Sequence, residues 1–106
     1  MTLRHVVLFR FQPAARADDV RRVEAAFAAL ASRIDEVQSL EWGVNHSPEG
    51  LDHGFTHCFS VGFENAAARD AYLVHPTHQA FSALAKPHLA DVLVIDYDAT
   101  AGAQVR

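Results

Sequence analysis

The chain has 106 residues, of which 50% are hydrophobic and 21% are charged, and its formal net charge is -4. A chain of this length without a linker-like stretch is expected to form one domain. Its nine Lys and Arg residues form no basic stripe, so neither nucleic acid nor an anionic membrane is an expected partner. The single cysteine excludes an internal disulfide. With no signal peptide or membrane span in view, a cytoplasmic location is expected.

The first half of the chain predicts a strand, a helix and a second strand. His5–Phe11 is β-branched and aromatic, and Pro13 ends this strand. Asp18 or Asp19 is expected to cap the helix. Its apolar face has residues three and four apart, namely Val20, Val23, Phe27, Leu30 and Ile34. The opposite face carries the charged residues Arg21, Arg22 and Glu24. Leu40–Val44 is expected to be a short strand bent at Gly43.

The second half predicts a strand, a broken helix and a final strand. Phe55–Phe63 alternates between large apolar and small side chains, as half-buried strands do. Asn65 is expected to cap the next helix, and Pro76 is expected to interrupt it and begin a second segment. Pro87 ends that segment, and Asp91–Asp98 forms the last strand.

The order βαββαβ predicts an α+β fold of the ferredoxin-like type, a four-stranded antiparallel sheet with helices on one face. Both faces of the first and last strands are apolar. Val6 and Leu8 face one way in the first strand, and Val7 and Phe9 face the other. Because helices cover only one face, the second face is expected to pack against another copy of the chain, giving a homodimer through the sheet.

Strand alternation and the helix break bring together residues suited to acid–base chemistry. His5 and His57 are expected on the helix side of the sheet, and Tyr72 and His78 flank Pro76. In the last strand Val92, Val94 and Asp96 share that face. A neutral imidazole accepts a proton near pH 7, and a phenol donates a hydrogen bond to a developing enolate oxygen. The combination predicts a small-molecule pocket.

Structural interpretations of the same residues stay open. A single strand histidine is more often a hydrogen-bonded core residue, and His75 before Pro76 is able to cap the second helical segment. Metal binding by His75 and His78 is not expected, since Pro76 breaks their helical face and no H-E-x-x-H pattern occurs. No glycine-rich phosphate loop or dinucleotide fingerprint is present, so no cofactor is expected. Cys58 is placed on the face assigned to the partner.

These residues together resemble the stress-responsive A/B barrel (Dabb) family of small dimeric α+β barrel proteins. The segments that carry the resemblance run from residue 3 to about 98: His5–Phe11, Phe55-Thr-His57, Tyr72-x-x-His75-Pro-x-His78 with Phe81, and Asp96-Tyr97. The resemblance implies a Dabb domain over residues 1–99, a C-terminal tail over 100–106 and assembly as a dimeric α/β barrel.

Within this family the chain looks like a plant polyketide cyclase, which closes a linear polyketide thioester by aldol condensation. That likeness implies that His78 is the general base and Tyr72 its hydrogen-bonding partner. It also implies that His5 and His57 line the cavity and that Asp96 orients an imidazole. The implied pocket for a small hydrophobic or aromatic, polyketide-like ligand is apolar, with Val7, Phe9, Val23, Phe27, Phe59, Phe81 and Val94 as its lining.

Three functions are therefore open. The first is a cofactor-independent polyketide cyclase or related lyase that works through a stabilised enolate. The second is a small-molecule-binding or stress-related protein with the same cavity and no turnover. The third is a cofactor-free or haem-linked monooxygenase, an activity found on similar dimeric barrels. No motif of the third group occurs in the sequence, and function follows the site rather than the fold.

Overall fold

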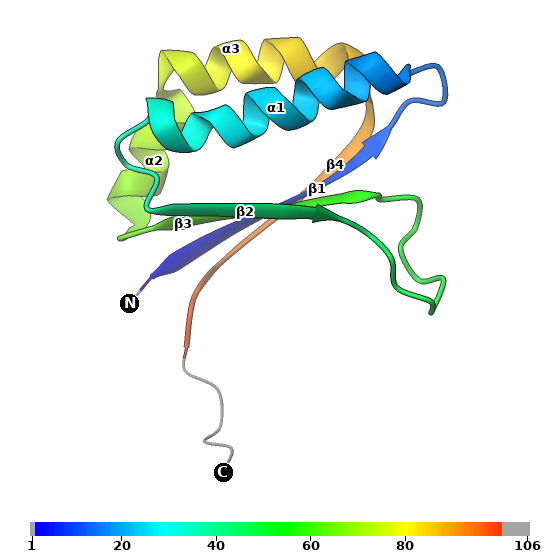
Figure 1. Cartoon of the computed structure of the whole chain (residues 1–106). Coiled ribbons are helices and arrows are strands. Elements are labelled where there is room, and N and C mark those ends of the chain that lie inside the picture. Colours follow the sequence, from blue (N-terminus) through cyan, green and yellow to red (C-terminus); the bar gives the residue numbers. More distant parts are fainter. Residues whose placement is uncertain (1, 101–106) are drawn as a thin grey trace.

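A computed structural model describes residues 2–100 and has the predicted ferredoxin-like βαββαβ fold. One antiparallel sheet has the strand order β2-β3-β1-β4, and the helices cover one of its faces (Figure 1). The elements are β1 (Leu3–Phe11), α1 (Ala17–Arg33), β2 (Ser39–Val44), β3 (His57–Phe63), α2 (Ala66–Val74), α3 (Pro76–Ala85), the 3-10 turn η1 (Lys86–His88) and β4 (Leu89–Asp98). The tail expected over residues 100–106 lies, apart from Thr100, outside the described residues.

The start of β3 and the position of the strand irregularity differ from the prediction. β3 begins at His57 rather than Phe55, because the backbone N–H of Phe55 closes a turn onto the carbonyl of Asp52 at 3.0 Å. The pairing of β2 with β3 runs through Gly43 without a register shift, so the expected irregularity is absent there. The observed shift lies in β1 between Arg10 and Phe11, opposite the start of β4.

The prediction that Asp18 or Asp19 caps α1 is wrong. The helix begins at Ala17 with Arg16 at the N-cap, so Asp18 and Asp19 lie inside the first turn. Asp19 accepts a hydrogen bond from the backbone N–H of Arg16 at 3.1 Å. Acidic side chains in a first turn are stabilised by the free N–H groups of the helix terminus. The predicted cap of α2 is confirmed, since Asn65 accepts from the backbone N–H of Ala68 at 2.9 Å.

The core lies between the helices and the sheet. Phe27 of α1 stacks on Phe59 of β3 with 4.0 Å between ring centroids and 4° between ring planes. Val23, Leu30 and Ile34, from α1 and the residue after it, are also almost fully buried. Burying an apolar side chain of this size contributes about 1.5–3 kcal/mol, so this face of α1 fixes the helix over β2 and β3.

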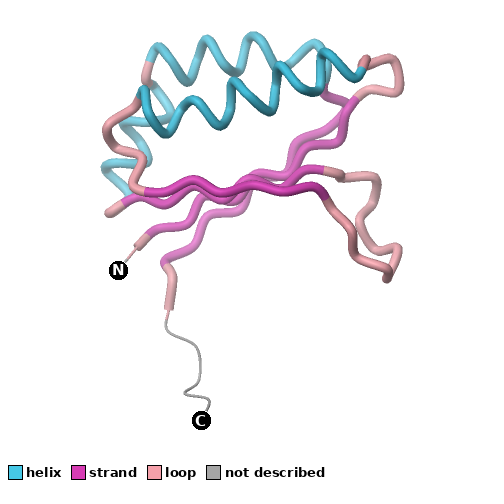
Figure 2. Tube along the Cα trace, in the orientation of Figure 1, coloured by secondary structure: helices cyan, strands magenta, loops and turns pink. Residues whose placement is uncertain are grey.

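No helix of the described residues covers the opposite face of the sheet (Figure 2). Register places Leu8 beside Leu93 and Val6 beside Ile95 on this face, with Cys58 on the neighbouring strand. Leu93 and Ile95 of β4 are exposed on this face, and Ile95 is 54% exposed. We call this surface the outer face. Among the described residues, no helix is both long enough and apolar enough to cross a membrane.

Candidate functional site

The structure divides the predicted polar residues between two ends of the core. His5 pairs with Val61 across the β1–β3 ladder, whereas His57 pairs with Phe9. These positions are four residues apart, which corresponds to about 13 Å along a strand. His5 therefore lies with Tyr72, His78 and Asp96, and His57 lies in a separate cluster.

Tyr72 and His78 face each other across the break between α2 and α3. Their ring centroids are 4.5 Å apart, and the ring of His5 lies 5.9 Å from that of Tyr72. Pro76 occupies the first turn of α3, where its missing N–H costs nothing. His75 caps this helix, since its Nδ1 accepts from the backbone N–H of Thr77 at 3.1 Å. The capping interpretation of His75 is thus confirmed.

The hydroxyl of Tyr72 is buried and has no hydrogen-bond partner among residues 2–100. Burial raises the pKa of this phenol well above its ordinary value, so it stays protonated. Polar side-chain atoms inside proteins normally have a partner, because an unpaired one costs free energy of desolvation. The hydroxyl therefore offers a donor to a ligand placed beside His78.

His78 is a half-buried side chain in the first turns of α3. Burial lowers its pKa below the ordinary value of 6.5, the Leu73 backbone carbonyl acts in the opposite direction, and the nearby His5 lowers it further. The imidazole is therefore neutral at pH 7 and has a nitrogen able to accept a proton. Tyr72 and His78 combine a protonated donor with a neutral base.

Asp96 orients His5 rather than His78. Its Oδ1 lies 2.7 Å from Nδ1 of His5, and its Oδ2 accepts from Nη1 of Arg69 at 3.1 Å. The strand register sets this contact, since His5 and Asp96 are direct partners across β1 and β4. Sequence reasoning missed Arg69, because one arginine on an amphipathic helix is indistinguishable from a solvated surface residue.

The second cluster surrounds His57 at the other end of β3. Nε2 of His57 lies 2.7 Å from Oε2 of Glu24, and Nδ1 lies 2.7 Å from Oγ1 of Thr56. The ring of Trp42 stacks parallel to the imidazole at 6.0 Å. Glu24 was assigned to the charged face of α1, but its side chain reaches the sheet and its carboxylate is largely buried. Both ring nitrogens of His57 are thus already bonded.

The apolar residues predicted to line a pocket fill the space between the two clusters. Phe9 packs on Phe59 at 5.4 Å, and Phe27 packs on Phe81 at 4.9 Å. Val7 and Val23 are also buried in this core. Val94 differs, because it lies on the helix side of the edge strand β4 and is 50% exposed. A ligand at Tyr72 would therefore have to displace aromatic side chains or enter along β4.

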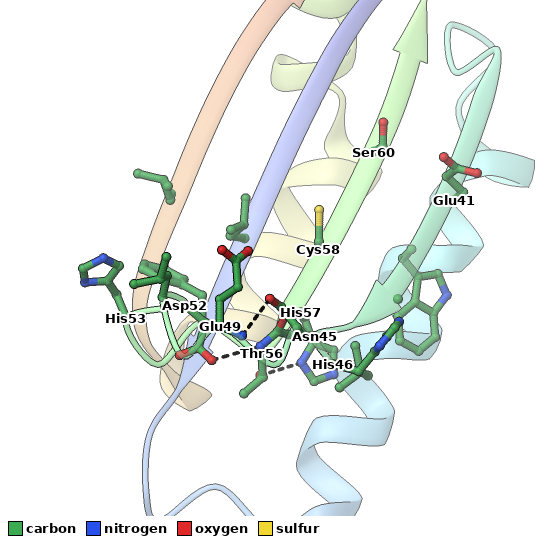
Figure 3. A pocket seen from close by; sticks show the side chains of 18 residues that line it. Glu41, Asn45, His46, Glu49, Asp52, His53, Thr56, His57, Cys58 and Ser60 are labelled. Atoms are coloured by element: carbon green, nitrogen blue, oxygen red, sulfur yellow. Dashed lines mark hydrogen bonds between the residues drawn. The ribbon is translucent and has the colours of Figure 1, made fainter.

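A concavity of about 1020 Å³ lies beneath the loop between β2 and β3, where the outer face meets Trp42, Thr56 and His57 of the second cluster. Figure 3 shows Cys58 and Ser60 projecting from the same side of β3 in this concavity. Asn45 and Asp52 hold the loop by a hydrogen bond of 2.9 Å. The lining includes Leu8 and Leu93 of the outer face and contains neither Tyr72 nor His78. Within residues 2–100, no group of three or more His, Cys, Asp or Glu side chains is arranged to hold a metal ion.

The structure is thus a small ferredoxin-like α+β chain in which a phenol and an imidazole lie side by side beneath the helices. The chain belongs to the Stress responsive A/B Barrel Domain (Dabb) family, which it matches over residues 3–99. It is 33% identical over 98 residues to the Arabidopsis thaliana stress-response A/B barrel domain-containing protein HS1, covering 92% of this chain and 90% of HS1. It is 22% identical over 97 residues to olivetolic acid cyclase of Cannabis sativa, covering 92% and 96%.

Solved structures agree with this assignment. The crystal structure of At3g17210 from Arabidopsis thaliana is similar with a TM-score of 0.89 and 31% identity, covering 96% of this chain and 99% of that one. A hydroxynitrile lyase from Passiflora edulis shares the fold with a TM-score of 0.85, 22% identity and 91% coverage of each chain. A dimeric ferredoxin-like protein from Thermobifida fusca has a TM-score of 0.76 and 28% identity, covering 92% and 90%.

Replacing Tyr72 by phenylalanine is expected to stabilise the protein. The substitution removes a buried hydroxyl without a partner and keeps the packed ring, so the free energy of unfolding should rise by about 1–3 kcal/mol. Urea unfolding of both proteins at one chain concentration measures this difference. A fall in stability would mean that the hydroxyl is bonded in solution, and the site would lose its free donor.

Proposed function

We propose that this protein is a cofactor-independent cyclase or lyase that moves a proton on a small hydrophobic or aromatic carbonyl compound. His78 is the general base and Tyr72 the hydrogen-bond donor to the substrate oxygen. The observation that carries the proposal is the buried Tyr72 hydroxyl, which has no hydrogen-bond partner in the described part of the chain, beside a neutral imidazole. Such a pair is complementary to an enolate, which needs a base at carbon and a donor at oxygen.

An aldol-type ring closure follows from these roles with its atoms in balance. Neutral His78 takes a proton from the carbon next to a carbonyl, the C–H bond breaks, and the electron pair moves onto the carbonyl oxygen. Tyr72 donates a hydrogen bond to that oxygen. The enolate carbon then attacks a second carbonyl of the same molecule, a C–C bond forms, and the new alkoxide takes the proton back from His78.

The protonation states at neutral pH match these roles. The lowered pKa of His78 leaves the imidazole unprotonated, and the raised pKa of Tyr72 keeps its proton on the phenol. Both shifts have burial as their largest cause, so the feature that encloses a ligand also prepares the two groups. No metal ion or organic cofactor takes part in the steps of this proposal.

The names of the similar proteins are consistent with this chemistry without requiring it. Olivetolic acid cyclase and hydroxynitrile lyase are a cyclase and a lyase, whereas HS1 is named for a stress response. Ligand binding without turnover is the second candidate, and the tight Phe9, Phe27, Phe59 and Phe81 packing favours it. Nothing among the described residues favours a monooxygenase over these two.

Assembly as a homodimer through the outer face belongs to the same proposal. That face is apolar over β1 and β4, and no helix within residues 2–100 covers it. A second copy would bury it by self-complementary contact. Similar structures from Thermobifida fusca and Bacteroides fragilis are described as dimeric proteins with a ferredoxin-like fold. The single Cys58 would then lie reduced in the interface, in keeping with a cytoplasmic location.

Proton exchange tests the base without knowledge of the natural substrate. Acetophenone in D2O is expected to exchange its methyl hydrogens faster with the protein than without it, as followed by proton NMR. His78→Ala should lower the catalysed rate by about 10²-fold or more, since a positioned base is lost. The rate should fall as pH drops through the pKa of His78, below 6.5, because protonation removes the base.

The exposed loop residue His46 supplies the matched control, and His46→Ala should exchange acetophenone like the original protein. Equal rates for His78→Ala and the original protein would refute the base assignment. Catalysis by neither protein, with acetophenone bound at the site, would favour the function of binding without turnover.

The unique cysteine reports on the proposed dimer. Light scattering should give twice the mass of one chain, and the Cys58 thiol should react slowly with a disulfide reagent because it is covered. Ile95→Arg places a charge on the outer face and should produce monomers with a fast-reacting thiol. Val74→Arg, on an exposed part of α2, is the control and should remain dimeric. A monomeric original protein with a fast-reacting Cys58 would contradict the interface.

A further inference from the structure

We propose that Arg69 is a positioning residue for the Tyr72–His78 site, which acts by fixing Asp96 and, through Asp96, the tautomer and orientation of His5. His5 then serves as the acceptor for a hydroxyl or enol of the ligand. This inference rests on the proposed function for the ligand, but the contacts that support the positioning role are independent of it.

The two oxygens of Asp96 are both engaged. Oδ1 is 2.7 Å from Nδ1 of His5, and Oδ2 is 3.1 Å from Nη1 of Arg69. Asp96 lies on the edge strand β4, where its only side-chain partners are these two groups among the described residues. Without Arg69 the carboxylate would be free to rotate toward solvent, since one side of an edge strand is open.

Through its contact with Asp96, Arg69 determines which ring nitrogen of His5 carries the proton. The guanidinium of Arg69 donates to Oδ2 of Asp96, and a carboxylate held in this way only accepts hydrogen bonds. Nδ1 of His5 must therefore be the donor across the 2.7 Å contact. A neutral imidazole with hydrogen on Nδ1 has its lone pair on Nε2. This tautomer is the less common one in free histidine.

Nε2 of His5 belongs to a ring that is packed among aromatic side chains. His5 is a buried residue, and its ring packs edge-on against Tyr72 at 5.9 Å and Phe63 at 6.2 Å. A ligand held by the Tyr72 hydroxyl would present its next polar group to Nε2 of His5. That nitrogen accepts from an enol or phenol O–H and does not accept from an ether.

Asp70 provides a contrast within the same contact network. Its carboxylate lies 3.1 Å from Nη2 of Arg69, on the side away from Nη1, and its side chain is 66% exposed. An exposed ion pair of this kind contributes little free energy. Asp70 and Asp96 thus contact the same guanidinium, but only Asp96 connects it to His5.

The tautomer of His5 tests the positioning role directly. Two-bond proton–nitrogen NMR spectra of the full protein labelled with ¹⁵N-histidine distinguish a protonated Nδ1 from a protonated Nε2, and the His5→Gln variant assigns the signals. At a pH where His5 is neutral, the original protein and Asp70→Asn should show hydrogen on Nδ1. Arg69→Met should shift most of the population to hydrogen on Nε2, and Arg69→Lys should recover part of the original pattern.

Resorcinol and 1,3-dimethoxybenzene test the ligand role as a pair. The original protein should bind resorcinol more tightly than its dimethyl ether, and Arg69→Met should lose most of this preference while Asp70→Asn keeps it. Retention of hydrogen on Nδ1 in Arg69→Met would overturn the positioning role. If Arg69→Met loses the hydrogen on Nδ1 but the original protein binds neither probe, the positioning role is upheld. The proposed ligand site is then contradicted.

Discussion

The absence of a backbone N–H at Pro76 is the constraint on which the site depends. Proline removes one helical hydrogen bond and its ring clashes with the carbonyl four residues earlier, which is that of Tyr72. The helix therefore ends at Val74 and a second helix begins at Pro76 in a new direction. A continuous helix would place positions 72 and 78 six residues apart and on different faces. The break instead sets the two rings 4.5 Å from one another.

The buried polar side chains of Tyr72 and His78 lower the stability of the fold, and packing elsewhere in the core compensates for this loss. A buried phenol without a partner and a neutral half-buried imidazole lower stability, because both lose hydration. The stacked Phe27 and Phe59 and the apolar face of α1 supply the compensating burial. Binding sites commonly keep such unsatisfied groups, since a ligand supplies the missing hydrogen bond. The packed aromatic residues also mean that ligand entry and side-chain movement must occur together.

The sequence predicted the elements and the faces of the strands, because both follow from local periodicity. It correctly placed His5, His57 and Asp96 on the helix side of the sheet. It did not reveal that His5 and His57 lie at opposite ends of the core, because antiparallel register aligns His5 with Val61 and depends on the whole sheet. Arg69 and Glu24 were missed for a related reason, since a helical charge turned inward looks like a solvated one until its partner strand is known.

The proposed chemistry requires a ligand to enter between Tyr72 and His78, and a crystal structure of the protein soaked with 2,4-dihydroxybenzoic acid tests this directly. The expected result is density for the acid between the two rings, with an oxygen about 2.6–3.2 Å from both the Tyr72 hydroxyl and a His78 nitrogen. Phe81 or Phe9 should have moved to make room. An unchanged aromatic core, with the acid absent or bound only in the outer-face concavity, would contradict the account and leave these polar residues with a structural role.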